Sequence, residues 1–252
     1  MNFRYALELA YRGTNYHGWQ IQPNASSVQE AIEKRLTRLM GNVPVSVVGC
    51  GRTDTGVHAS YYVLHFDAGK DLDPEQLVYK LNKMLPDDIA VFSAKHVTAD
   101  FHARFSATSR TYRYFIHRKK NAFLLDSYHL VQEVNFDAMN QAAKHLLGTH
   151  DFTSFSKLHT DVKTNTCTVS AAEWIRGAND CWYFEINADR FLRNMVRAVV
   201  GTLLEVGTGN LGEKDILRIM QAKDRGEAKL SVPAKGLFLV QIHYPEELFL
   251  PG

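Results

Sequence analysis

The stretch that decides the fold is VSVVGCGRTDTGVHASYYVLHF, which covers residues 45–66. Its two ends, 45–48 and 61–66, are rich in β-branched and aromatic residues and predict two strands. The polar connection between them runs from Cys50 to His58 and contains two glycines. A hairpin needs only a few turn residues, so a connection of this length and composition predicts a functional loop.

The segments outside this strand pair complete a β-α-β-β-α-β order. Alternating apolar residues predict the outer strands, and apolar residues at helical spacing predict the helices. The elements are a strand at 3–9, a helix capped by Ser27 and Glu30 that ends at Gly41-Asn42, a helix opened by Asp73-Pro74 and closed by Pro86, and a strand at 89–97.

The second half of the chain repeats this order without obvious sequence identity. The predicted elements are a strand at 111–117, a helix at 136–147, a hairpin of 168–175 and 182–186, a long helix along 192–204, an added helix at 213–222 and a last strand at 237–243. The expected fold is therefore α+β, with two fused split-βαβ halves of the RRM or ferredoxin-like type, residues 1–104 and 105–252. Their mostly antiparallel sheets are expected to leave a central cleft.

Composition excludes few functions. The 252 residues carry a formal charge of +2 and 45% hydrophobic residues, which is ordinary for a soluble globular protein. The three cysteines are an odd number without metal-type spacing, so no metal site is expected. Without a secretory signal or an apolar run long enough to span a membrane, the sequence predicts a cytoplasmic protein with no membrane contact.

Asp54 is the candidate catalytic residue of the loop. It stands between two threonines, with Gly51 and Gly56 allowing unusual backbone angles and Arg52 two residues away. An Asx turn, in which the carboxylate only caps backbone amides, explains the same spacing. His58 is expected to be a packed or solvated histidine rather than a catalytic base, and it has no part in the predicted chemistry.

Basic residues gather in two later segments. The run 104–120 holds six Lys and Arg, four aromatics and no acid, which suits phosphates and stackable bases, although a solvated strand face is the alternative. Arg190, Arg193 and Arg197 flank the apolar stripe of the long helix, where Arg197 could reach a cleft and pair with a carboxylate. The predicted RNA contacts of these segments are Arg104, Arg110 and Arg193.

Five motifs, in order along the whole chain, resemble those of the TruA-type tRNA pseudouridine synthase family. They lie at 11–20, 51–59, 101–114, 195–197 and 235–240. The resemblance implies isomerisation of uridine to pseudouridine in the tRNA anticodon stem-loop, at tRNA positions 38, 39 and 40. It also implies a homodimer that shares the tRNA, and no cofactor or metal.

The same resemblance gives five residues a role in this sequence. Asp54 is the implied nucleophile, Tyr112 stacks on the target base, and Arg197 pairs with Asp54. Leu237 packs beneath the base, and Arg52 helps to open the stem.

Two other functions compete with this one. The tripeptide Asp54-Thr55-Gly56 also occurs in aspartic proteases, and one copy per chain would require a homodimer. Arg52-Thr53 precede the tripeptide, where such proteases place apolar residues. A non-catalytic protein of tandem RRM-like units is the second alternative, but the aromatic signature of such units is absent from the sequence.

Overall fold

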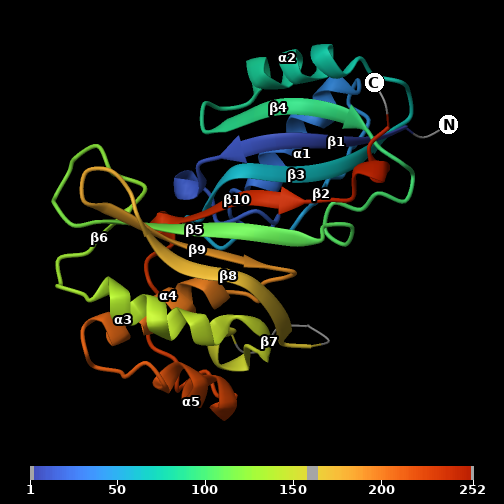
Figure 1. Ribbon diagram of the computed structural model, residues 1–252. Helices are drawn as coiled ribbons and strands as arrows, with labels where there is room; N and C mark the ends of the chain where they lie inside the picture. Colours follow the sequence, from blue (N-terminus) through green and yellow to red (C-terminus); the bar gives the residue numbers. More distant parts are fainter. Residues whose placement is uncertain (1–2, 158–163, 251–252) are drawn as a thin grey trace. The chain divides into compact units, whose positions relative to one another are not determined.

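The computed structural model of the chain describes residues 3–157 and 164–250. Its contacts divide the chain into two compact units, Met1–Thr108 with Leu239–Gly252, and Ser109–Phe238. The division predicted from the sequence, 1–104 and 105–252, breaks the chain slightly earlier and counts the last strand with the second half. Figure 1 follows the chain through its elements from blue to red.

The first unit has the predicted β-α-β-β-α-β order. Its elements are β1 (Phe3–Tyr11), α1 (Val28–Leu39), β2 (Val48–Gly49), β3 (His58–Ala68), α2 (Pro74–Met84) and β4 (Ile89–His96), followed late in the chain by most of β10 (Leu237–His243). β1 lies between β3 and β4 and pairs antiparallel with both. β2 pairs antiparallel with β3, and β10 is the next strand beyond β3.

Helix boundaries in this unit follow from capping chemistry. The Ser27 hydroxyl accepts a hydrogen bond from the Glu30 amide at 3.2 Å, and the Asp73 carboxylate caps the first turn of α2, which opens with Pro74. Gly41 and Asn42 both have positive φ, which ends α1 as predicted. The inner faces of both helices are buried and bear the leucine, isoleucine and valine residues of their stripes.

The second unit is built around a four-stranded sheet in the order β5-β9-β8-β7, with the short β6 parallel to β5. Its elements are β5 (Ser109–His117), β6 (Tyr128–His129), α3 (Phe136–Ala143), β7 (Gly148–Asp151), β8 (Thr166–Arg176), β9 (Cys181–Ala188), α4 (Met195–Gly207) and α5 (Asp215–Ala222). The predicted α+β class with mostly antiparallel sheets is confirmed, while the central cleft stays a prediction.

Some predicted boundaries were wrong. The strand predicted at 45–48 shrinks to Val48–Gly49 because side chains of α1 bond to the backbone before it: Val47 donates to the Glu33 carboxylate at 2.9 Å and Val45 to the Thr37 hydroxyl at 3.1 Å. Peptide groups satisfied in this way need no neighbouring strand.

The long helix begins at Met195 rather than at 192. Asn194 has a left-handed φ of 67°, a conformation that asparagine tolerates better than most residues. A residue in this conformation cannot belong to a right-handed helix, so the helix does not extend to its N-terminal side. Within the described residues, no helix is long and apolar enough to cross a membrane, and no group of three or more His, Cys, Asp or Glu side chains is arranged to hold a metal ion.

Candidate active site

The loop that carries Asp54 is held by the segment that follows β1. The Trp19 amide donates to the Thr53 carbonyl at 3.2 Å, and the Gly56 amide donates to the Tyr16 carbonyl at 3.3 Å. These bonds lie on either side of Asp54, which is itself half-buried. The backbone around the carboxylate is thereby fixed by a segment that is far from it in sequence.

Buried aromatic side chains also contact the loop or pack beside it. The Tyr11 and Thr53 hydroxyls share a hydrogen bond of 2.8 Å, and the Tyr62 hydroxyl donates to the Gly51 carbonyl at 2.5 Å. The Tyr62 ring stacks on Trp19 with centroids 4.1 Å apart. Because buried hydrogen bonds and close-packed rings hold their partners in one arrangement, these contacts fix the loop's position.

Two glycines let the backbones approach this closely. A Cβ on Gly18 would lie 2.3 Å from the Thr53 carbonyl oxygen, and its φ of +92° disfavours any other residue. A Cβ on Gly13 would lie 2.0 Å from the Val57 carbonyl oxygen. The Gly13 amide also donates to Nδ1 of His58 at 3.0 Å, and His58 is only 1% exposed. Of the two expected states of His58, packed or solvated, the structure shows the packed one.

Tyr112 lies on β5, opposite Ile186 of β9. Its ring is 9% exposed and meets Phe191 edge-to-face, with centroids 4.9 Å apart. Arg110 is equally buried and donates to the Asp189 carbonyl at 3.0 Å. The two side chains thus hold the segment that leads into α4. Sequence analysis did not single out Phe191, because nothing local marks its contact with β5.

Arg197 of α4 holds the segment before the last motif. Its Nε donates to the Val232 carbonyl at 2.8 Å, and its own carbonyl accepts from the Val232 amide at 3.2 Å. The Tyr114 hydroxyl donates to the neighbouring Pro233 carbonyl at 2.9 Å. Burial raises the pKa of Tyr114, with a smaller opposing effect from the Arg197 charge. Arg197 and Tyr114 therefore fix the backbone that leads to Leu237.

Leu237 itself is 6% exposed. The preceding Gly236 lies directly against β5, since a Cβ there would be 2.8 Å from the Phe115 carbonyl oxygen and 2.9 Å from the Tyr114 ring. The second unit thus gathers the tyrosine strand, the arginine helix and the start of the last motif, up to Phe238. Pairing between Arg197 and Asp54, which belongs to the first unit, stays a prediction.

The basic run 104–120 is less unopposed than its sequence suggests. Acids from other segments pair with three of its cations: Glu185 with Arg113 at 2.6 Å, Glu133 with Arg118 at 2.8 Å, and Asp180 with Lys119 at 2.8 Å. Carboxylates from outside the run therefore offset part of its charge: Glu185 lies across the β5–β9 pair, whereas Glu133 and Asp180 lie outside the strands. Among the predicted RNA contacts, Arg52, Arg104 and Arg193 are exposed.

A second cationic feature lies between α1 and α2. A groove of about 380 Å³ is lined by Lys34, Arg35, Arg38, Lys83 and Met84. Sequence analysis did not single out this groove. Lys34 and Arg38 lie one turn apart on α1, but only the packing of the two helices adds Lys83.

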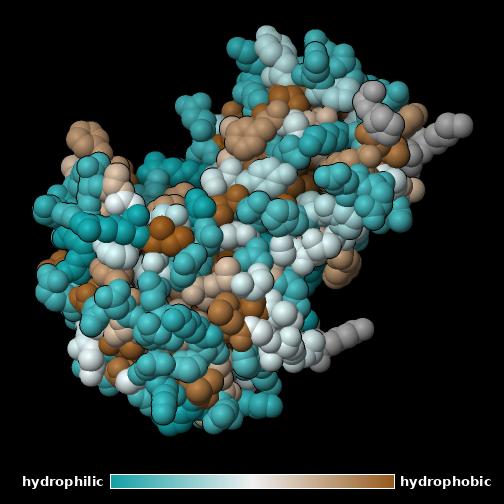
Figure 2. Space-filling model, in the orientation of Figure 1, coloured by the Kyte–Doolittle hydropathy of each residue, from teal (hydrophilic) through white to brown (hydrophobic). Residues whose placement is uncertain are grey.

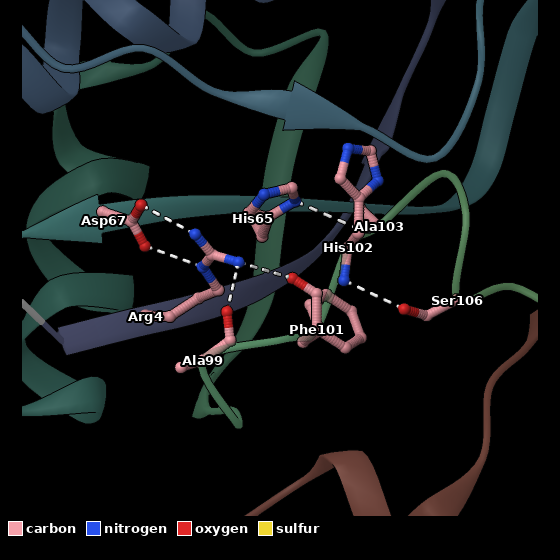
Figure 3. A network of polar contacts seen from close by, with 8 residues as sticks. All are labelled: Arg4, His65, Asp67, Ala99, Phe101, His102, Ala103 and Ser106. Carbon is pink, nitrogen blue, oxygen red and sulfur yellow. Dashed lines mark hydrogen bonds and ion pairs between the residues drawn. The ribbon is translucent and has the colours of Figure 1, made fainter.

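Arg4 fixes the segment that leads to Arg104. Its guanidinium pairs with both oxygens of Asp67, at 2.7 and 2.9 Å, and donates to the Ala99 and Phe101 carbonyls at 2.6 and 2.9 Å (Figure 3). Four hydrogen bonds from one planar group define both position and orientation. The segment from residue 99 onward is therefore tied to β1 and β3.

His65 completes this anchor from β3. Its Nδ1 accepts a hydrogen bond from the Ala103 amide at 3.1 Å, so this nitrogen carries no proton (Figure 3). Burial, the Arg4 charge and the neighbouring His102 lower the pKa of His65 to about 4, against a weaker opposing effect of Asp67. A neutral imidazole can accept this bond, whereas an imidazolium cannot.

Acid should weaken this anchor. The unfolded chain binds a proton at His65 near its ordinary pKa of about 6.5, and the folded chain only near 4. Stability is therefore lost as pH falls from 6.5 towards 4, by about 2 kcal/mol between pH 7 and pH 5. Urea unfolding at several pH values should show this loss in the parent and not in His65→Asn, whose amide oxygen still accepts the bond. In the surface control His17→Asn, the free energy of unfolding should depend on pH as in the parent. The same pH dependence in all three proteins would contradict the role given to His65.

Comparison with known proteins identifies the class. The sequence profile described as tRNA pseudouridine synthase matches residues 9–106 and 142–245, which include the Asp54 loop, Arg197 and the last motif. The chain belongs to the tRNA pseudouridine synthase family, and it is an isomerase.

Three relatives that cover nearly the whole chain are each named tRNA pseudouridine synthase A. The protein of Parabacteroides distasonis is 53% identical, with 98% of each chain covered. The protein of Bacteroides thetaiotaomicron is 51% identical over 98% of this chain and 92% of its own. That of Porphyromonas gingivalis is 49% identical over 98% and 99%.

Proposed function

We propose that this enzyme isomerises uridine to pseudouridine in the anticodon stem-loop of tRNA, at positions 38 to 40, with Asp54 as the nucleophile. The observation that carries the proposal is the Asp54 loop: hydrogen bonds and two glycines of the preceding motif fix it on both sides of the carboxylate. A solvated turn needs no such support. The names of the relatives supply tRNA as the substrate.

The reaction sets what the residues must do. The N1–C1′ bond of uridine breaks, the base rotates, C5 joins C1′, and the proton on C5 is lost. A carboxylate at Asp54 promotes this by adding to the base, or by adding to or deprotonating the sugar. The detached base has to stay oriented while it turns, which requires a confined pocket rather than an open surface.

The second unit is proposed to supply that confinement. A base removed from its stack needs an aromatic or apolar surface on each face. Tyr112, braced by Phe191, is suited to stack on the base, and the buried Leu237 to pack beneath it. Arg197 is proposed to pair with Asp54 and keep it ionised, while its Nε holds the Val232 carbonyl.

Exposed cations are proposed to bind the phosphates of the tRNA. Arg52, Arg104 and Arg193 are exposed, and the groove between α1 and α2 adds four cations. Arg110, which is buried, is proposed to contribute by holding the segment before α4 rather than by direct contact alone. The enzyme is proposed to act as a homodimer that shares the tRNA, in the cytoplasm where tRNA resides.

An unmodified tRNA transcript labelled with tritium at C5 of uridine tests the proposal directly. Because C5 exchanges its hydrogen for C1′, each turnover releases one tritium into water. Release from an anticodon stem-loop with uridine at positions 38 to 40 is expected, and none from a stem-loop with cytidine there. Tight tRNA binding without release would favour the non-catalytic RNA-binding alternative.

Affinity for tRNA should fall steeply with salt. Binding that neutralises phosphates releases counterions, so four contacts predict about a hundredfold loss between 50 and 200 mM salt. Replacing Lys34, Arg38 and Lys83 together by glutamine should weaken tRNA binding. It should also flatten the plot of the logarithm of affinity against the logarithm of salt concentration, as measured by filter binding.

A charge-matched control uses three ion-paired cations of the second unit, because Lys34 of the groove is itself paired with Glu30 at 2.6 Å. Lys119 and Arg176 pair with Asp180, and Lys223 pairs with Asp151. Replacing these three by glutamine removes the same formal charge and should change the slope less. Equal slopes for the two triple variants would exclude the groove as a phosphate contact.

Tyr112→Phe and Tyr112→Ala should separate the ring from its hydroxyl. The phenylalanine variant keeps the edge-to-face contact with Phe191 and should bind tRNA like the parent, with a lower turnover if the hydroxyl takes part. The alanine variant loses the ring, and its turnover should fall by a factor that corresponds to more than the roughly 1–3 kcal/mol of one stacking contact. Single-turnover rates at saturating tRNA measure this, and near-parent rates for both variants would remove Tyr112 from the site.

A further inference from the structure

Asp88 stands in the short turn between α2 and β4, outside the motifs on which the family resemblance rests. The outer face of α2 is mostly hydrophilic (Figure 2), and water alone can hold such side chains. Asp88 differs from them, because it is half-buried and bonds to the segment that follows β1. Its Oδ1 accepts from the Tyr16 hydroxyl at 2.7 Å, its Oδ2 from the Asn15 side-chain amide at 3.1 Å, and its carbonyl from the Arg12 amide at 2.8 Å. One residue of the turn thus binds this segment at three points.

The same segment, residues 12–16, holds the loop that carries Asp54. The Tyr16 carbonyl accepts a hydrogen bond from the Gly56 amide at 3.3 Å. Tyr16 is therefore bonded to Asp88 through its hydroxyl and, through its carbonyl, to a residue that lies two positions after Asp54. A shift of Tyr16 has to shift Gly56 or break this bond.

The contact between Tyr16 and Asp88 is of a strong kind. Tyr16 is only 8% exposed, so its hydroxyl needs a partner within the protein. A hydrogen bond from a hydroxyl to an ionised carboxylate is short and roughly twice as strong as one between neutral groups. Burial raises the pKa of Tyr16, and the hydrogen bond and charge of Asp88 raise it further, against a weaker opposing effect of Arg35. The hydroxyl therefore stays protonated and donates to Asp88 at neutral pH.

The segment depends on such contacts because it is short. Gly13–Asn15 is a single turn of 3-10 helix, and a helix of this length cannot hold its own position. Contacts with other elements therefore decide where it lies. Asp88 bonds to it at both ends, at Arg12 before the turn and at Asn15 and Tyr16 at its close.

We propose that Asp88 is a positioning residue for the isomerisation, which acts through Tyr16 to fix Gly56 and the backbone beside Asp54. The role rests on the proposed function, in which Asp54 is the nucleophile. In that mechanism Asp88 touches no reacting atom, so its loss affects the rate of reaction and not the affinity for tRNA. A displacement of about half an ångström, half of the shift that costs about a hundredfold, predicts a loss on the order of tenfold in turnover.

Asp88→Ala and Tyr16→Phe test this role, with the C5-tritiated tRNA transcript as the probe. Each variant should lower the single-turnover rate at saturating tRNA on the order of tenfold, at a temperature well below its melting transition, and should bind tRNA like the parent. The double variant should be little slower than Asp88→Ala alone, because both substitutions remove the same contact. Asp87→Ala is the matched control, since it removes the same charge from an exposed neighbour, and it should keep the parent's rate and affinity.

Parent rates in Asp88→Ala and Tyr16→Phe, with Asp54→Asn inactive, would overturn the positioning role and leave the proposed function standing. Lower melting temperatures at an unchanged rate would also overturn it, because the contact would then support only the fold. So would rate losses that multiply in the double variant, because the two residues would then act independently. A parent enzyme that binds tRNA and releases no tritium would overturn the proposed function, and the positioning role with it.

Discussion

Asp54→Asn is expected to stop isomerisation completely while leaving the fold and tRNA binding nearly intact. An amide cannot act as the attacking carboxylate. The loop itself should survive, because backbone bonds hold it on either side of the carboxylate: the Asp54 carbonyl accepts from the Val57 amide at 3.1 Å, and Thr53 and Gly56 bond to the preceding motif. Tritium release, thermal unfolding and filter binding on the same preparation measure the three properties.

Two further variants sharpen this test. Asp54→Glu keeps the charge but moves the carboxylate by about one ångström, which is enough to cost on the order of a hundredfold in rate. Asp87→Asn removes an exposed carboxylate of the same unit and should be fully active. If Asp54 only capped a turn, asparagine would preserve that role and most of the activity. A fully active Asp54→Asn enzyme would therefore contradict the proposal that Asp54 is the nucleophile.

Local signals predicted most of the first unit. Ser27 and Asp73 cap helices that begin where their side-chain chemistry requires, and the alternation of β1 matches the burial of its residues. The strand at 45–48 could not be predicted correctly in this way. Its backbone bonds to Glu33 and Thr37 of α1, and no pattern within the segment reveals that its partner is a helix.

The candidate site divides in the same way. The length and chemistry of the loop around Asp54 were visible in the sequence, and so was the basic, aromatic character of β5. The hydrogen bond between Tyr11 and Thr53 joins residues 42 positions apart and arises only from tertiary packing. The ion pair between Arg113 and Glu185 was not visible in the sequence for the same reason, since Glu185 reaches Arg113 across the β5–β9 pair.

Gly18→Ala is expected to have the second-largest effect, although Gly18 touches no reacting atom in the proposed mechanism. Its methyl group would lie 2.3 Å from the Thr53 carbonyl oxygen and 3.3 Å from the Asp54 carbonyl carbon, at a φ of +92°. Both neighbours are backbone atoms, so the loop has to move. Overpacking and the strained φ together should cost roughly 2–4 kcal/mol of stability.

The rate should suffer separately from the stability, because the shift moves the Asp54 carboxylate. A displacement of about one ångström predicts on the order of a hundredfold loss in turnover at saturating tRNA, below the melting transition. Gly51→Ala is the matched control, since it lies in the same loop with nothing within 4 Å of its added Cβ, and it should retain parent stability and rate. A Gly18→Ala enzyme that is less stable but turns over at the parent rate would show that the first motif supports the fold without positioning Asp54. Equal losses in both variants would mean instead that the loop tolerates no side chain anywhere, and that the close approach of Gly18 to Thr53 is not the cause.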